Sequence, residues 1–280
     1  MKRYRVLSFD FDARVNSLTV AIKDESEARV KSMHEQNQRK IEEGLIYEFG
    51  TLDDHRKKLD FVDLGAMPWS VIAFHNAFQR QIRTAFVMGA YYPALAGACG
   101  LGERILNHLV LMFREQFRNS ASYKHVYSKD SFDNWELAIR ALESWSILRP
   151  EVAQLFREFC VTRNRGLHFR PEVDSNARGA ALEAIGQLNK IISEQFGCCA
   201  SLPWLFPVPG ETYVRKSAEC DPFVKGIYLP NCHLVGYKHR LDLDAGRFVL
   251  RDDDEYEECE ITDEEFSRLR RANNAPARPT

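Results

Sequence analysis

Residues 101–117 read LGERILNHLVLMFREQF, and their apolar spacing is the strongest indication of the fold. Apolar residues recur there every three or four positions and cover nearly half of a helical circumference. They are Leu101, Ile105, Leu106, Leu109, Val110, Met112, Phe113 and Phe117. A helix with so broad an apolar face is buried between other helices or between subunits. The sequence therefore predicts a helical bundle around this stretch, in a homodimer that covers the remaining apolar flank.

The same spacing continues on both sides of this stretch. It predicts further helices over residues 68–89, 135–145, 150–169 and 175–196. The expected breaks between the helices are Pro93, a polar loop over residues 119–131, Pro150 and Pro171. Ser131 or Asp133 is the expected N-cap of the helix over residues 135–145. Residues 68–197 are thus predicted to form one all-α bundle.

The two flanks of the bundle have a different character. Within residues 1–67 the sequence predicts one or two strands over 1–23, the later one around residues 18–22. It also predicts an exposed helix over 24–44 that stops at Gly44, and an irregular charged connection over 50–67. Residues 198–271 predict a small antiparallel β unit with strands near 212–216, 225–229, 233–243 and 247–251, and a closing helix over 262–271. A hairpin turn is expected at Asp244–Arg247, and the tail over residues 272–280 should be disordered. The predicted fold class is α+β.

Composition narrows the class of protein. Hydrophobic residues make up 45% of the chain and charged residues 28%, and the formal net charge is −2, so bulk charge does not indicate a nucleic-acid or membrane partner. No apolar stretch approaches the ~20 residues that span a bilayer. Asp10 and Asp12 interrupt the first apolar run, which excludes a signal peptide. We expect a soluble, cytoplasmic protein with no membrane partner.

The cysteines do not predict a metal site. There are seven, scattered along the chain, which favours reduced thiols. Cys220, Cys232, His233 and Cys259 could be drawn as a zinc site, but they lack the closely spaced pairs that such sites use. We therefore expect no bound metal.

The chemistry-bearing stretch is residues 160–171, which read CVTRNRGLHFRP. On an ideal helix, Arg163 falls on the apolar stripe that Phe156 and Phe159 form, while Asn164 and His168 share a neighbouring face. A cation on a core face needs a partner or an anionic ligand. Periodicity leaves two interpretations open. Arg163 belongs to a functional site, or it pairs with a carboxylate, Glu103 or Glu158, while His168 caps the helix.

The segment Arg163-Asn164-Arg165-Gly166-Leu167-His168 resembles the R-x4-6-H signature of HEPN domains, and the likeness covers roughly residues 68–196. The resemblance implies a metal-independent endoribonuclease without a cofactor, often a toxin or defence effector. Its site would form across a homodimer, and RNA and a regulatory protein would be its partners.

Each residue of this stretch then has an expected role. His168 would move protons, Arg163 would stabilise the phosphate and Asn164 would orient either group. RNA contacts are expected from Arg165, Arg170 and Lys124, and support for the site from Glu103 and His75. Some members of the family are inactive, so a HEPN module that binds RNA, a nucleotide or a protein without cutting is the alternative.

The sequence leaves two interpretations open for one more charged segment. Residues 252–260 read DDDEYEECE and contain no basic residue. A solvated acidic surface is the simplest interpretation. The other interpretation is an inhibitory segment that covers the basic site and keeps the enzyme inactive.

Overall fold

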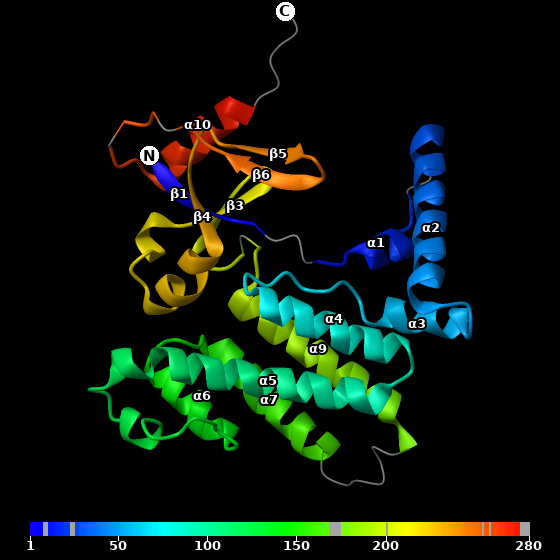
Figure 1. Cartoon of the computed structure of the whole chain (residues 1–280), viewed down its shortest axis with the longest axis horizontal. Helices are drawn as coiled ribbons and strands as arrows, with labels where there is room; N and C mark the ends of the chain where they lie inside the picture. The colour runs from blue at the N-terminus through cyan, green and yellow to red at the C-terminus, as the bar shows by residue number, and fades with distance from the viewer. Residues whose placement is uncertain are drawn as a thin grey trace, which may run out of the picture. The chain divides into compact units, whose positions relative to one another are not determined.

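The computed structural model describes residues 1–7, 11–22, 26–167, 175–199, 201–253, 255–257 and 259–274. The chain is α+β, as the sequence predicted, and it divides into two units (Figure 1). The helical unit comprises Asp10–Gln195, and the sheet unit comprises Met1–Phe9 together with Phe196–Thr280. Residues 1–67, predicted as one segment, are thus shared between the two units, because the first strand joins the sheet.

The bundle is built from α4 (Ala73–Val87), α5 (Tyr91–Phe113), α6 (Trp135–Ser144), α7 (Pro150–Leu167) and α9 (Ala177–Phe196). Helix α5 contains most of the apolar stretch 101–117, and it packs against α4, α6 and α7 (Figure 1). Leu95, Ile105 and Phe113 are buried along its length. Pro93 does not break α5 but lies in its first turn, where its missing N–H costs no hydrogen bond.

The connection between α5 and α6 contains two short 3₁₀ helices, η1 (Arg114–Phe117) and η2 (Tyr123–His125). The predicted N-caps of α6 were wrong. Asn134 caps the helix instead, and its Oδ1 accepts a hydrogen bond from the backbone N–H of Leu137 at 3.3 Å. An Asn one position before the apolar stripe satisfies an otherwise unpaired helix N–H.

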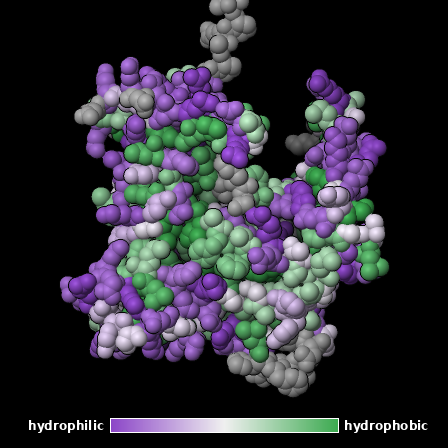
Figure 2. All heavy atoms as spheres, in the orientation of Figure 1, coloured by the Kyte–Doolittle hydropathy of each residue, from purple (hydrophilic) through white to green (hydrophobic). Residues whose placement is uncertain are grey.

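The helical unit begins with α1 (Arg14–Thr19), α2 (Ala28–Phe49) and α3 (Asp54–Asp63). The strand predicted near residue 18 and the irregular connection over 50–67 were therefore wrong. Helix α2 also continues through Gly44 and ends at Gly50, whose φ of 79° suits a helix terminus. Leu45 and Phe49 are the buried residues of α2, and the helix extends past Gly44 because their burial stabilises its last turns. Figure 2 shows mostly hydrophilic residues along α2.

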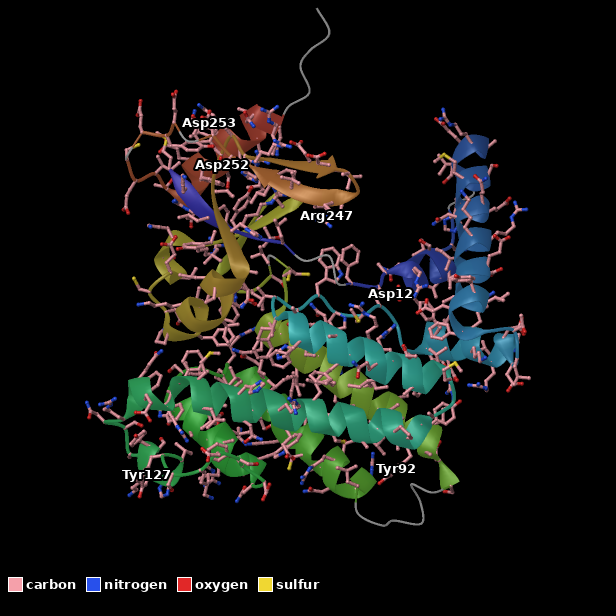
Figure 3. All side chains as sticks on the ribbon, viewed as in Figure 1. Asp12, Tyr92, Tyr127, Arg247, Asp252 and Asp253 are labelled. Atoms are coloured by element: carbon pink, nitrogen blue, oxygen red, sulfur yellow. The ribbon has the colours of Figure 1, made fainter. Side chains whose placement is uncertain are left out.

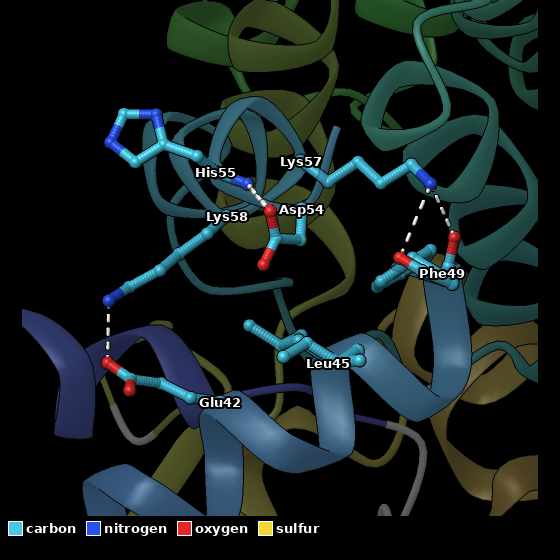
Figure 4. Close-up of a pocket in the computed structure, with 9 residues that line it drawn as sticks. Glu42, Leu45, Phe49, Asp54, His55, Lys57 and Lys58 are labelled. Atoms are coloured by element: carbon cyan, nitrogen blue, oxygen red, sulfur yellow. Dashed lines mark hydrogen bonds and ion pairs between the residues drawn. The ribbon is translucent and has the colours of Figure 1, made fainter. Parts of the chain in front are cut away.

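Two buried charged residues hold α3 in place. The Nζ of Lys57 donates to the carbonyl of Phe49 at 2.6 Å, so it pairs with the unsatisfied end of α2 (Figure 4). The carboxylate of Asp60 accepts hydrogen bonds from Arg56 at 2.6 Å, Arg178 at 2.8 Å and the Tyr91 hydroxyl at 2.9 Å. These bonds join α3 to the first turns of α5 and α9.

The sheet unit contains a four-stranded antiparallel sheet in the order β2-β3-β1-β4. Its strands are β1 (Lys2–Val6), β2 (Leu205–Val208), β3 (Glu211–Val214) and β4 (Cys232–Gly236). Strand β1 pairs with β3 and β4, although about two hundred residues separate them in the chain. The core of this unit comprises Phe206, Val208, Tyr213, Val235 and Phe266.

The predicted hairpin is confirmed as β5 (Arg240–Asp244) and β6 (Arg247–Arg251). Its turn residues Ala245 and Gly246 have φ of 48° and 77°, the signs that a two-residue hairpin turn requires. The strand predicted near residues 225–229 was wrong, because Val224–Tyr228 forms a π-helical turn, η4, with Val224, Ile227 and Tyr228 buried. The closing helix is confirmed as α10 (Asp263–Asn274).

A buried charge cluster joins α10 to the sheet. Glu211 pairs with Arg270 at 2.6 Å and with Arg5 at 3.0 Å, and it accepts a hydrogen bond from the Tyr213 hydroxyl. Burial alone would raise the pKa of Glu211, but hydrogen bonds from Arg270 and Tyr213 outweigh it and lower that pKa to about 2. Arg5 also contacts Nε2 of His239 at 2.6 Å. The cluster is therefore a structural element of the sheet unit.

Within the described residues, none of the helices is both long enough and apolar enough to span a membrane.

Candidate functional site at the end of helix α7

Helix α7 places the Arg163 motif at its last turn. Pro150 begins the helix, and Val152, Phe156 and Phe159 lie on its buried face. Gly166 continues that face, and a Cβ there would lie 2.9 Å from Cδ2 of the buried Leu95. The end of α7 therefore lies directly against α5, and this packing sets the position of Arg163.

Three groups on three helices orient the guanidinium of Arg163. Its Nη2 lies 3.0 Å from Oε2 of Glu103 on α5, and its Nη1 donates to Oδ1 of Asn164 at 3.1 Å. The guanidinium carbon lies 5.6 Å from the centroid of the Trp135 ring on α6. The same Glu103 oxygen accepts the indole N–H of Trp135 at 3.4 Å. The sequence requirement for a partner to Arg163 is thus met by Glu103, and Glu158 is not that partner.

This ion pair is open to solvent. The side chain of Arg163 is 23% exposed and that of Glu103 is 29% exposed. Among the described residues, the Nε of Arg163 is buried and has no hydrogen-bond acceptor. An Arg held by one carboxylate at a partly exposed edge keeps donors available for a second oxyanion, and its planar fork suits a phosphate.

The thiols beside Arg163 are not nucleophiles. Asn164 donates to Sγ of Cys160 at 3.7 Å. Burial raises the pKa of Cys160, although Arg163 acts in the opposite direction. Burial likewise raises the pKa of Cys99 to about 12. Both thiols are therefore protonated near neutral pH and unsuited to attack on a substrate.

Arg165 pairs with a different carboxylate from the one that binds Arg163. Its guanidinium forms an ion pair with Glu183 on α9, and the hydroxyl of Thr162 donates to the same carboxylate at 3.4 Å. The pair is about half exposed, at 49% for Arg165 and 44% for Glu183. A phosphate at Arg165 must therefore compete with a carboxylate through water, where an exposed ion pair contributes only about 0–1 kcal/mol.

Lys124 and His75, two other predicted site residues, lie away from Arg163. Lys124 is exposed in η2, beyond the end of α5, and no contact between it and Arg163 occurs among the described residues. His75 is buried inside the helical unit, with Nδ1 3.1 Å from the Ser70 hydroxyl. Burial, with a smaller contribution from His108, lowers the pKa of His75 to about 3, so its ring is neutral at physiological pH. His75 therefore acts as a core histidine.

His168 and Arg170 lie outside the described residues, so their predicted roles rest on the sequence. What the structure brings together is Arg163, Asn164 and Glu103. The sequence did not single out Trp135, which lies beside Arg163, or Glu183, which pairs with Arg165.

The described residues of the acidic segment 252–260 form their hydrogen bonds and ion pairs within the sheet unit. Asp252 accepts the backbone N–H of Gly236 at 2.8 Å and the hydroxyl of Tyr256 at 2.6 Å. Asp253 pairs with Lys238 at 3.1 Å. Figure 3 labels both carboxylates, Asp252 and Asp253. These carboxylates therefore already have partners in the sheet unit.

A metal centre is not evident in the described part of the chain, where no three His, Cys, Asp or Glu side chains lie close enough to hold an ion. Comparison of the chain with protein-family models, with curated proteins and with solved structures gave no match.

Proposed function

We propose that this chain is a HEPN-type endoribonuclease that cuts RNA without a metal ion, in a toxin or defence role. The observation that carries the proposal is the position of Arg163. It lies at the end of a buried bundle helix, oriented by Glu103 and Trp135 and partly exposed, beside Asn164 and five residues before His168. This is the order and context of the R-x4-6-H signature.

The proposed reaction uses the RNA's own 2′-hydroxyl. An imidazole removes its proton, the oxygen attacks the adjacent phosphorus, and the bond to the 5′-oxygen breaks as that oxygen is protonated. The products are a 2′,3′-cyclic phosphate and a 5′-hydroxyl. Negative charge grows on the phosphate oxygens in the transition state, where the guanidinium of Arg163 stabilises it. In a homodimer with both motifs at one cleft, the two copies of His168 would serve as base and acid.

One observation favours the non-catalytic alternative, a HEPN module that binds RNA, a nucleotide or a protein. Arg163 and Arg165 are both paired with carboxylates, Glu103 and Glu183. An enzyme must share or exchange these partners when the phosphate arrives. A module that only binds at another surface would have no such requirement.

The deciding experiment is RNA cleavage in EDTA by purified protein, with analysis of the product ends. We expect His168→Ala and Arg163→Ala each to lower the rate by about 10²–10⁴, the usual loss for a positioned acid–base or oxyanion-stabilising group. Arg163→Lys should be nearly as poor, because an ammonium cannot form the bidentate contact.

Arg157→Ala is the matched control. Arg157 lies on the same helix and pairs with Glu136 and Glu143, so its loss also breaks ion pairs, but outside the motif. It should cleave RNA at the wild-type rate once folding is verified by circular dichroism. Cleavage that needs a divalent ion, or that persists in His168→Ala, would refute the mechanism and leave the binding module as the better proposal.

The assembly has its own test. We expect light scattering at micromolar concentration to give the mass of a homodimer, since the site is proposed to need two copies. A monomer under conditions in which RNA is cleaved would show that one chain carries the whole activity.

A further inference from the structure

The first part of the connection between α5 and α6 forms a structured loop, here called the tyrosine loop and defined as residues 114–129. Its interior is fixed by packing and hydrogen bonds. Val126 is fully buried, and the rings of Phe117 and Trp145 are stacked with centroids 5.2 Å apart. The indole N–H of Trp145 donates to the Ser120 hydroxyl at 2.8 Å. Arg114 donates to the carbonyl of Val126 at 3.3 Å. The loop is therefore preorganised.

What this scaffold presents to solvent is one aromatic ring among cations. Tyr127, which is labelled in Figure 3, is 55% exposed, and its ring centroid lies 5.9 Å from that of Tyr123. Lys124, His125 and Lys129 are exposed on the same short segment. The single carboxylate of the loop, Glu115, is occupied by Arg118 and by the Tyr123 hydroxyl. The loop thus has four Lys and Arg residues against one Glu, and the exposed Asp130 that follows it lies 3.9 Å from Arg114.

We propose that the tyrosine loop binds single-stranded RNA, with an unpaired base stacked on Tyr127 and the backbone phosphates near Lys124 and Lys129. The inference rests on the proposed function for the identity of the strand as RNA. Single-strand sites combine an exposed aromatic ring with cations that follow the backbone, and they do so without reading the sequence. An unpaired base exposes the face that such a ring needs, whereas a duplex keeps its bases stacked on one another.

Helix α5 connects the tyrosine loop to the site around Arg163. Its anchor, Arg114, lies about three helical turns, roughly 16 Å, from Glu103 along the helix axis. The chain then returns along α5, where the backbone N–H of Phe132 donates to Asn107 at 2.7 Å and the indole of Trp135 reaches Glu103. A strand held at the tyrosine loop therefore lies beyond the end of α5, the helix whose Glu103 pairs with Arg163.

The test measures the affinity of the full-length chain for a labelled oligouridylate by fluorescence anisotropy, with His168→Ala in every protein to prevent cleavage. Tyr127→Ala should weaken binding at least about fivefold, the lower end for loss of one stacked base. Tyr127→Phe, which keeps the ring, should bind as the parent does. Lys124→Ala with Lys129→Ala should weaken binding and reduce its salt dependence, by about 0.7 in log–log slope for each phosphate that the protein no longer neutralises.

Two matched controls separate this site from general effects. Tyr92 is a tyrosine on the same unit with a similar exposure, 58%, so Tyr92→Ala should bind as the parent does. Arg39→Ala with Lys40→Ala removes the same charge from the exposed face of α2. A Tyr127→Ala protein that binds no more weakly than Tyr92→Ala would overturn the inference. So would tight binding of a duplex, or no binding of the oligouridylate at all.

The outcomes also distinguish this inference from the proposed function. If Tyr127→Ala weakens binding but the wild-type chain never cuts RNA, the tyrosine loop stands and the nuclease fails. If the wild-type chain cuts RNA and Tyr127→Ala changes neither affinity nor cleavage, the nuclease stands and the tyrosine loop fails.

Discussion

Three glycines on one helix offer a sharp test of the packing that supports the site. Gly97, Gly100 and Gly102 all lie in α5, but their surroundings differ. A Cβ added at Gly100 would meet nothing within 4 Å. At Gly97 it would lie 3.0 Å from Cγ1 of Ile82, and at Gly102 it would lie 2.6 Å from Cε1 of Phe159. The same chemical change should therefore have three different effects on stability.

The magnitudes follow from two opposing contributions. Gly→Ala within a helix stabilises it by about 0.8–1 kcal/mol, because alanine loses less backbone entropy on folding. Forcing a methyl group into a packed core costs about 1–3 kcal/mol. Gly100→Ala should thus be stabilised by up to ~1 kcal/mol, and Gly97→Ala should be close to neutral. Gly102→Ala should be destabilised by about 1–2 kcal/mol, because its neighbours Phe159 and Trp135 are fully buried and cannot move aside.

Urea unfolding followed by far-ultraviolet circular dichroism measures this order. With a slope near 2 kcal/mol per molar urea, Gly102→Ala should lower the midpoint by about 0.5–1 M, and Gly100→Ala should raise it. The gap between those two variants is the decisive quantity, since helix propensity cancels between them. If Gly102→Ala proves as stable as Gly100→Ala, the close approach of α5 to Phe159 and Trp135 is refuted, and with it the support for Arg163.

Other predictions follow from single residues. The pKa of His75 is about 3 in the folded state, below an unfolded value near 6.5, so its contribution to stability should be lost as pH falls through that window. His75→Gln should flatten the pH dependence of the unfolding midpoint between those values. The pKa of Glu211 is likewise lowered, to about 2, so stability should fall between about pH 4.5 and 2 in the wild-type chain. Glu211→Gln should be less stable at neutral pH and lose less on acidification, as measured by acid titration of the circular dichroism signal. Asp253→Asn with Glu255→Gln should leave RNA affinity at low salt unchanged, because Asp253 is already paired with Lys238; a clear gain in affinity would instead favour an acidic segment that covers the basic site.

The position of Arg163 shows how far periodicity can predict a site. The spacing of Phe156 and Phe159 predicted that Arg163 lies on the apolar stripe of its helix with a need for a partner, and in the structure its side chain is 23% exposed and paired with Glu103. Periodicity named two candidate partners and could not choose between them. Glu103 is the partner because α5 packs against α7, and Gly166 permits the two helices to lie this close together.

The wrong predictions have local physical causes. Gly44 was interpreted as a helix stop, but a glycine ends a helix only where the chain needs a positive φ, and that position is Gly50. The segment 54–63 has few apolar residues, so no periodicity indicated α3. Ion pairs with Asp60 and the hydrogen bond from Lys57 to the end of α2 stabilise it instead.

The helical bundle, the β5–β6 hairpin and the motif around Arg163 could be predicted from the sequence, because each depends on residues close together in the chain. The pairing of β1 with the C-terminal strands and the orientation of Arg163 by Glu103 and Trp135 became evident only in the folded chain. Those contacts join segments far apart in sequence. They depend on which surfaces fit together once each element has formed, and hydrophobic spacing marks the face that will be buried without specifying what will bury it.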